Sequence, residues 1–222
     1  MLNELEKQYK GKKNYYFQDA RHELLEFIPK TTKSILDIGC SSGNFGKSIK
    51  QNLGCEVWGV EPNKQSFDMA VKNLDKVFFG TIEDVIENIP DKYFDCISFN
   101  DVLEHLIDPW SVLSLVKTKL SDSGYILASI PNVRYFKNLQ NLLINQNWEY
   151  SKDGILDKTH LRFFTKKSMQ SMFNECGFSI ESINGINPFD SFKYRLFSTL
   201  TFNKFVDTKF LQFVILAKPK TQ

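Results

Sequence analysis

The sequence predicts an α/β protein built on a doubly wound, Rossmann-like, mostly parallel sheet of seven strands with an antiparallel last strand. Between residues 33 and about 132, short apolar runs alternate with helical patterns, which is typical of parallel strands joined by helices on both faces of a sheet. A glycine-rich turn follows the first apolar run, as in α/β proteins that bind ligands at the carboxyl edge of the sheet. The chain, 1–222, has the length of one domain.

Five apolar runs mark the expected strands of the alternating region, namely 34–38, 56–60, 77–79, 94–99 and 125–130. Two sets of apolar residues between these runs repeat at the i, i+3, i+4, i+7 spacing of a helix; they are Phe67, Ala70, Val71 and Leu74, then Ile82, Val85, Ile86 and Ile89. Pro131 ends the fifth run. We therefore expect helical crossovers between successive parallel strands.

The chain after the fifth strand departs from this alternation. We interpret residues 133–164 as an insertion that forms a lid near the site, with a helix indicated by the spacing of Leu139, Leu142 and Leu143. Thr165 is expected to cap a further helix that ends at Gly177, a residue suited to a left-handed helix end. Strands over 178–183 and 210–217 complete the expected sheet, and the aromatic-rich segment between them is expected to pack in the core.

Composition and charge indicate the general class of the protein. Lys and Arg number 28 against 26 Asp and Glu, so the overall charge does not demand nucleic acid or an anionic membrane as partner. The four cysteines are widely spaced and form no CxxC pair, which favours a reducing compartment. The N-terminus lacks a signal-peptide pattern and no run approaches the ~20 apolar residues of a membrane span. We expect a cytoplasmic protein with a small-molecule partner and an N-terminal helical cover over residues 1–32.

The turn after the first strand has the composition of a ligand-binding loop. Asp37 ends the strand, and Gly39 and Gly43 stand where side chains would obstruct a ligand. Glu61 ends the second strand twenty-four positions after Asp37. In nucleotide-binding folds an acidic residue about 20 positions after the glycine loop binds the ribose hydroxyls. Because the glycines fall at 39, 43 and 46, the spacing disfavours the GxGxxG fingerprint of dinucleotide-binding enzymes.

A second set of polar residues follows the fourth strand. Asp101, Glu104 and His105 have the i, i+3, i+4 spacing that places side chains on one helix face, and His160 is expected to fold back over the same edge. Two carboxylates and two imidazoles form a plausible divalent-metal set. Two other interpretations stay open: Asp101 caps a helix while Glu104 faces solvent and His105 bonds within the fold, or His105 or His160 acts as a direct general base.

At the glycine loop the chain resembles the class I S-adenosylmethionine-dependent methyltransferases, whose first motif reads much like residues 36–43. The resemblance covers most of the chain and includes residues 80–84, 93–97 and 124–127. It implies S-adenosylmethionine as methyl donor, held by Asp37, Gly39, Gly43 and Asn100 at its methionine end, by Glu61 at the ribose and by Thr81 and Ile82 at the adenine, with Cys40 and Pro62 as further contacts. Ser41 departs from a common middle glycine, and Thr81 from a common aspartate.

The second set resembles that of metal-dependent O-methyltransferases which modify the 3′-terminal ribose of small RNAs, and that of the ubiquinone-pathway O-methyltransferases. The resemblance implies a divalent ion, Mg²⁺, Mn²⁺ or Zn²⁺, held by Asp101, Glu104, His105 and His160, that binds the accepting hydroxyl. Asp101 stands where a glutamate is usual, which shortens the reach by one methylene.

Residues 129–134, 148–150 and 157–165 resemble methyltransferases of bacterial glycan biosynthesis. This resemblance implies a sugar or sugar nucleotide as methyl acceptor, with a quinone or other phenol as the second choice. Tyr16, Arg134 and Arg162 are candidate substrate contacts, since arginine pairs well with phosphate or carboxylate. A non-catalytic S-adenosylmethionine-binding module and an RNA ribose methyltransferase remain as alternatives, although no strand-tracking basic groove is evident in the sequence.

Overall fold

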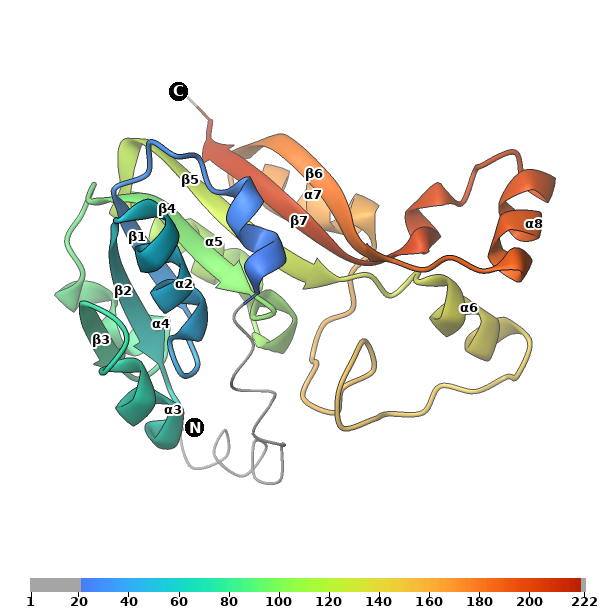
Figure 1. Ribbon diagram of the computed structural model, residues 1–222, viewed down its shortest axis with the longest axis horizontal. Helices are drawn as coiled ribbons and strands as arrows, with labels where there is room; N and C mark the ends of the chain where they lie inside the picture. The colour runs from blue at the N-terminus through green and yellow to red at the C-terminus, as the bar shows by residue number, and fades with distance from the viewer. Residues whose placement is uncertain (1–20, 221–222) are drawn as a thin grey trace.

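A computed structural model describes residues 21–220, in which seven strands form one sheet. The strands are β1 (Ser34–Ile38), β2 (Glu56–Glu61), β3 (Lys76–Phe79), β4 (Phe94–Asn100), β5 (Leu120–Pro131), β6 (Phe178–Pro188) and β7 (Phe210–Pro219). Their order is β3-β2-β1-β4-β5-β7-β6 (Figure 1). The first five strands pair in parallel, and β7 lies antiparallel between β5 and β6. The predicted fold class is confirmed.

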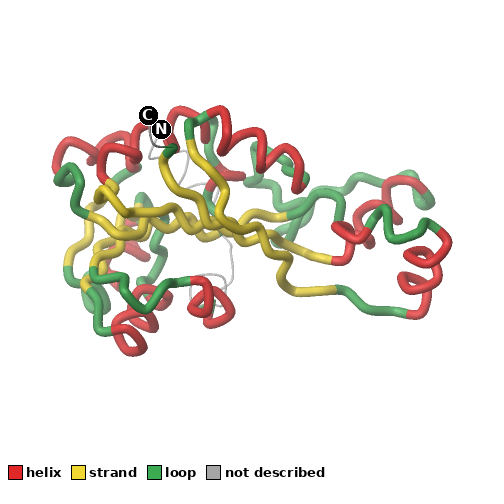
Figure 2. Tube along the Cα trace, turned by 90° about the horizontal axis from the view of Figure 1, so that it is seen from above, coloured by secondary structure: helices red, strands yellow, loops and turns green. Residues whose placement is uncertain are grey.

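Helices cover both faces of this sheet (Figure 2). The α-helices are α2 (Asn44–Leu53), α3 (Lys64–Ala70), α4 (Ile82–Val85), α5 (Pro109–Val116), α6 (Phe136–Leu143), α7 (Lys166–Glu175) and α8 (Phe192–Leu200). Short 3-10 helices are η2 (His22–Phe27), η3 (Ile86–Asn88), η4 (Leu103–His105), η5 (Lys117–Lys119) and η6 (Val206–Lys209). Hydrophobic residues on the two sides form two separate core clusters.

Strand β1 supplies side chains to both clusters because successive residues of a strand point to opposite faces. Ile35 packs in the cluster that contains Phe45 and Ile49 of α2, whereas Leu36 belongs to the cluster that contains residues of α5 and α7. All five residues of β1 are buried, as expected for a central parallel strand covered on both faces. The strand is thereby fixed in register, and so is the loop that follows it.

Two predicted helix ends are confirmed. Thr165 caps α7 by accepting a hydrogen bond at its side chain from the Ser168 backbone N–H, 3.1 Å away. Gly177 follows α7 with a φ of +77°, a conformation that glycine adopts without the cost of a β-carbon.

The helix that the spacing of Leu139, Leu142 and Leu143 indicated in segment 133–164 is present as α6, and an irregular stretch follows it. The segment 186–210 differs most from the sequence-based expectation, because it contains α8, a helix that the sequence patterns did not indicate. Figures 1 and 2 place α6 and α8 beyond the ends of β5, β6 and β7, at one end of the molecule. Tyr194 is buried there as expected of a core aromatic, but Phe192 and Phe202 are exposed.

Candidate functional site

The candidate site lies at the carboxyl ends of β2, β1 and β4, three neighbouring strands of the sheet. Glu61 is the last residue of β2 and Asn100 the last residue of β4, while Asp37 is the penultimate residue of β1. The order β2-β1-β4 brings these polar residues to one edge although they are far apart in the sequence. Parallel sheets bind ligands at this edge.

The loop from Gly39 to Gly43 bends sharply between β1 and α2. Gly39 and Gly43 have φ values of +69° and +76°, and a β-carbon on Gly39 would lie 2.7 Å from a methyl group of Val102. Ser41, between them, also has a positive φ of 50°. This conformation explains why a glycine at the Ser41 position is common in the family that the sequence resembles.

Asp37 is buried and accepts a hydrogen bond from the Ser98 hydroxyl at 2.6 Å. The side-chain amide of Asn100 approaches the same carboxylate oxygen at 3.4 Å. Burial raises the pKa of Asp37 to about 7, although the Ser98 hydrogen bond acts in the opposite direction. A cationic group bound beside Asp37 would favour the ionised carboxylate.

Glu61 is also buried, and its two carboxylate oxygens accept backbone N–H groups from Ser41 at 2.7 Å and Asn63 at 2.8 Å. Burial raises the pKa of Glu61 to about 7 despite these hydrogen bonds. Through Ser41, Glu61 ties the end of β2 to the glycine loop after β1. The two segments assigned to a nucleoside ligand by resemblance are thus held together by one side chain.

The remaining predicted donor contacts lie in this loop and after β2 and β3. Cys40 is buried, and burial raises the pKa of its thiol well above the ordinary value, so it is an inert packing residue rather than a nucleophile. Pro62 directly follows Glu61, and Ile82 is buried at the start of α4. Thr81 caps α4, and its hydroxyl donates to Asp84 Oδ2 at 2.8 Å.

Three of the four predicted metal ligands come together beyond β4. Potential ligand atoms of Glu104, His105 and His160 all lie within 4.8 Å of one another. The imidazole rings of the two histidines meet edge to face, with centroids 4.6 Å apart. His160 reaches this position because the backbone N–H groups of Leu161 and Arg162 donate to the Glu104 carbonyl at 2.9 and 3.0 Å.

Backbone carbonyls fix the orientation of both histidines. His105 Nδ1 lies 3.0 Å from the Thr159 carbonyl oxygen, and His160 Nδ1 lies 2.9 Å from that of Ile155. A carbonyl only accepts, so each Nδ1 carries a proton, and in the neutral form of each imidazole Nε2 then carries the lone pair. Metal-ligating histidines are oriented in this way by hydrogen bonds from the other ring nitrogen.

Glu104 is 1% exposed, which overturns the alternative in which it faces solvent. Neither of its carboxylate oxygens has a hydrogen-bond partner among the described residues, although His160 Nε2 lies 3.9 Å from one of them. Burial, followed by the nearby Asp101 charge, raises the pKa of Glu104 well above its usual range. A buried carboxylate without hydrogen bonds is costly in itself, and a cation between it and the two imidazoles would remove that cost.

Asp101 does not join this cluster within the described structure. It has a φ of +55° and precedes the short helix η4, so the three residues do not share the helix face that their spacing predicted. Its carboxylate pairs with the Arg21 guanidinium and accepts from Gln212 Nε2 at 2.7 Å and Ser129 Oγ at 3.2 Å. These contacts direct Asp101 toward β5 and β7.

The three predicted substrate contacts have separate surroundings. Arg134 donates to both carboxylate oxygens of Asp207, at 2.7 and 3.2 Å, and Arg162 donates to the Ile107 carbonyl oxygen. Tyr16 lies outside the described residues. Arg162 is exposed and adjoins the Glu104 backbone, whereas the guanidinium of Arg134 is paired with a carboxylate.

Sequence reasoning missed three residues that shape the site. Ser98 bonds Asp37, Gln212 bonds Asp101, and buried Asp157 accepts the Thr159 N–H and hydroxyl at 2.9 and 2.8 Å, in the turn that presents His160. Gln212 is a lone polar residue in an apolar stretch of β7, and Ser98 interrupts the apolar residues Ile97 and Phe99 of β4; these interruptions are the signal that could have identified them.

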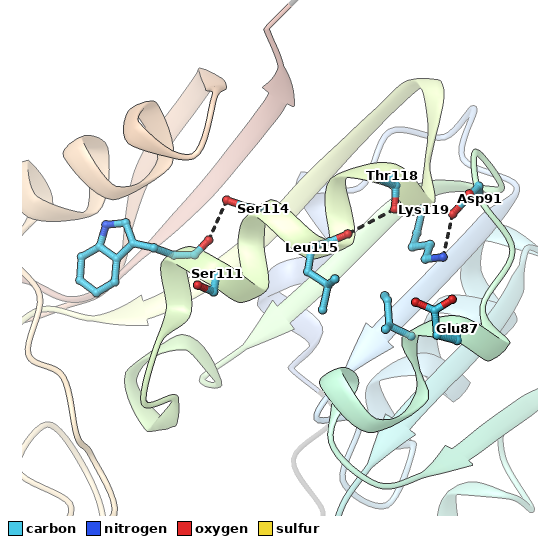
Figure 3. Close-up of a pocket in the computed structure, with 9 residues that line it drawn as sticks. Glu87, Asp91, Ser111, Ser114, Leu115, Thr118 and Lys119 are labelled. Carbon is cyan, nitrogen blue, oxygen red and sulfur yellow. Dashed lines mark hydrogen bonds and ion pairs between the residues drawn. The ribbon is translucent and has the colours of Figure 1, made fainter.

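A surface groove of about 690 Å³ lies elsewhere, between η3 and α5 (Figure 3). Lys119 Nζ donates to Asp91 Oδ1 at 2.7 Å there, and the Thr118 hydroxyl donates to the Leu115 carbonyl at 3.3 Å. Its polar groups are thus largely engaged with one another, and it contains none of the predicted site residues.

Comparison with known proteins identifies the family of the chain. A family model described as "Methyltransferase domain" matches residues 9–183. A ubiquinone biosynthesis O-methyltransferase of Proteus mirabilis is 26% identical over 186 residues, which are 80% of this chain and 74% of that protein.

Solved structures show the same fold. A methyltransferase from Archaeoglobus fulgidus has a TM-score of 0.65 at 23% identity, covering 97% of this chain and 98% of its own. Another from Aquifex aeolicus has a TM-score of 0.60 at 14% identity, covering 97% and 95%. The chain therefore belongs to the methyltransferase domain family and is a class I S-adenosylmethionine-dependent methyltransferase.

Proposed function

We propose that the enzyme transfers the methyl group of S-adenosylmethionine to a hydroxyl of a small molecule, with a divalent ion bound by Glu104, His105 and His160. The observation that carries this proposal is the cluster of these three side chains, of which Glu104 and His105 shortly follow Asn100 in the sequence. Val102, two residues before Glu104, lies against Gly39 of the loop to which the donor's methionine end is assigned, which supports a cluster close to the donor. The name of the O-methyltransferase relatives supports a hydroxyl acceptor.

The donor set fits an ion of intermediate softness. Two imidazoles and one carboxylate suit Zn²⁺ or Mn²⁺ better than Mg²⁺, which prefers oxygen ligands. Such an ion, when bound, lowers the pKa of a coordinated hydroxyl and fixes its oxygen. Glu104 supplies a negative charge inside the fold, while the Thr159 and Ile155 carbonyls hold both imidazoles in the tautomer that coordination requires.

The chain's other residues bind and orient the two substrates. Asp37 and Glu61 hold the donor through its amino and ribose groups, and the left-handed glycine turn lets the backbone approach it closely. Arg162, exposed beside the cluster, is suited to an anionic group on the acceptor. A sugar or sugar nucleotide is our first acceptor class, and a phenol is the second.

We also place the enzyme in the cytoplasm. All four cysteines are free and buried, which supports a reducing compartment. No helix among the described residues is long and apolar enough to cross a membrane.

The test is methyl transfer from labelled S-adenosylmethionine to a panel of sugar nucleotides and phenols, first in EDTA and then with Mn²⁺, Zn²⁺ or Mg²⁺. We expect transfer to a hydroxyl that EDTA stops and an added ion restores. Glu104→Met should lose transfer but keep S-adenosylhomocysteine binding, whereas the matched exposed control Glu181→Met should behave as wild type. Full transfer in EDTA would contradict the metal-assisted mechanism and would leave a histidine acting directly as the general base. Tight donor binding with no transfer to any cell-extract acceptor would favour a binding module.

A further inference from the structure

The two helices beyond the sheet form a small lobe with its own apolar interior. We define the α6–α8 lobe as residues 133–144 and 189–210. Phe136 of α6 stacks on Phe189 with ring centroids 5.8 Å apart, and it contacts Tyr194 and Phe197 of α8, each at 5.3 Å. These contacts tie the two helices to each other at the end of the molecule (Figures 1 and 2).

The outside of this lobe is apolar as well. Phe192, Leu196 and Leu200 are spaced four residues apart on α8, which places them on one face of the helix, and all three are exposed. Phe192 is 82% and the nearby Phe202 87% exposed, and Leu143 at the end of α6 is 73% exposed. Single exposed apolar residues are ordinary, but a cluster of large ones marks an interaction surface.

The lobe also carries a net positive charge, which helps to decide what kind of partner binds its apolar surface. Its basic residues are Arg134, Lys137, Lys193, Arg195, Lys204 and Lys209, against only Asp190 and Asp207. The two acids pair with arginines, Arg195 with Asp190 and Arg134 with Asp207. The four lysines therefore account for the net positive charge of the lobe. Because the whole chain has a net charge of only +2, the rest of the chain is net negative.

We propose that the α6–α8 lobe docks on the surface of an anionic lipid bilayer. Exposed phenylalanine and leucine on a helix flanked by lysines is the composition of an element that lies in the membrane interface, and anionic headgroups attract each nearby lysine. Docking of a second copy through the same face is disfavoured, because a symmetric contact would bring the net positive charge of one lobe against that of the other. This proposal does not depend on the metal or on the acceptor.

The experiment is co-sedimentation of the full chain with vesicles of phosphatidylcholine alone or of equimolar phosphatidylcholine and phosphatidylglycerol. The apolar contribution is removed in the triple variant Phe192→Ser/Leu196→Ser/Phe202→Ser, and the charge in Lys137→Glu/Lys204→Glu. Val71→Ser, which changes an exposed apolar residue outside the lobe, is the matched control. Wild-type affinity for S-adenosylhomocysteine verifies that each variant is folded.

We expect the chain to sediment with the anionic vesicles, to do so less at high salt, and to sediment poorly with phosphatidylcholine alone. The triple variant should lose at least about tenfold in partition coefficient, the lysine variant should lose its preference for anionic vesicles, and the control should match wild type. Equal sedimentation with both vesicles, or a folded triple variant that binds as wild type does, overturns the proposal. So does a dimer, detected without lipid, that the triple variant abolishes in a chain with no vesicle binding.

Discussion

Replacing Glu104 by methionine is expected to stabilise the metal-free chain while it abolishes metal-dependent methyl transfer. In the structure the Glu104 carboxyl group is buried and neither oxygen has a hydrogen-bond partner among residues 21–220. Methionine is unbranched and of similar length, so it can occupy the same space without polar atoms. A residue that lowers stability in this way is expected where function requires it.

The size of the effect follows from the two unpartnered oxygens. Leaving a buried polar group without a hydrogen bond costs about 1–3 kcal/mol, so the free energy of unfolding should rise by about that amount in Glu104→Met. For a chain of this length each kcal/mol raises Tm by about 2–4 °C.

The gain should also depend on pH. Because the pKa of Glu104 is raised in the fold, the unfolded chain ionises first and stability falls as pH rises above about 4. The gain from methionine should therefore be larger near pH 8 than near pH 5.

Urea unfolding in EDTA measures this change. The matched control is Asp157→Leu, since Asp157 is equally buried but accepts two hydrogen bonds from Thr159. That variant should lose about 2–4 kcal/mol because two buried donors are left without an acceptor. A Glu104→Met chain that is less stable than wild type in EDTA would refute the reasoning, since it would show that the carboxyl group has a structural partner.

Three further predictions concern the donor loop and the arginines. Because burial raises the pKa of both Asp37 and Glu61 to about 7, affinity for S-adenosylhomocysteine should fall below pH 7, by up to about tenfold per pH unit for each carboxylate that must be ionised, and calorimetry of Asp37→Asn should show weak binding with a shallower pH dependence. Gly39→Ala should lower the free energy of unfolding by about 1 kcal/mol for the left-handed backbone conformation, and by a further amount for the 2.7 Å clash with Val102. In urea unfolding, the double variant Gly39→Ala/Val102→Ala should recover only the part that is due to the clash. Arg134→Ala should lower Tm and leave KM unchanged, whereas Arg162→Ala should raise KM for an anionic acceptor; the reverse pattern in steady-state kinetics would contradict both assignments.

The parallel part of the fold follows from local sequence patterns. The run 34–38 is buried throughout and is mostly apolar, and the glycines after it mark positions with positive φ. His160 was expected near His105 because both flank the carboxyl edge of the sheet, and the structure brings them together.

Features that depend on distant partners could not be predicted in this way. The spacing of Asp101, Glu104 and His105 suggested a helix, but Arg21 and Gln212 hold Asp101 in a left-handed turn, and nothing local to the motif indicates those partners. The cationic lobe could not be predicted from the nearly balanced charge of the whole chain either. Its lysines lie in two segments that are distant in the sequence and that only the fold brings together.

Titration of Mn²⁺ into the metal-free chain by calorimetry tests the central claim most directly. We predict saturable binding of one ion per chain, with a heat that depends on the buffer because Glu104 releases a proton. Glu104→Met and His160→Ala should both abolish this binding, and Glu181→Met should retain it. No saturable binding by the wild type, or undiminished binding by both site variants, would contradict the assignment of Glu104, His105 and His160 as a metal site.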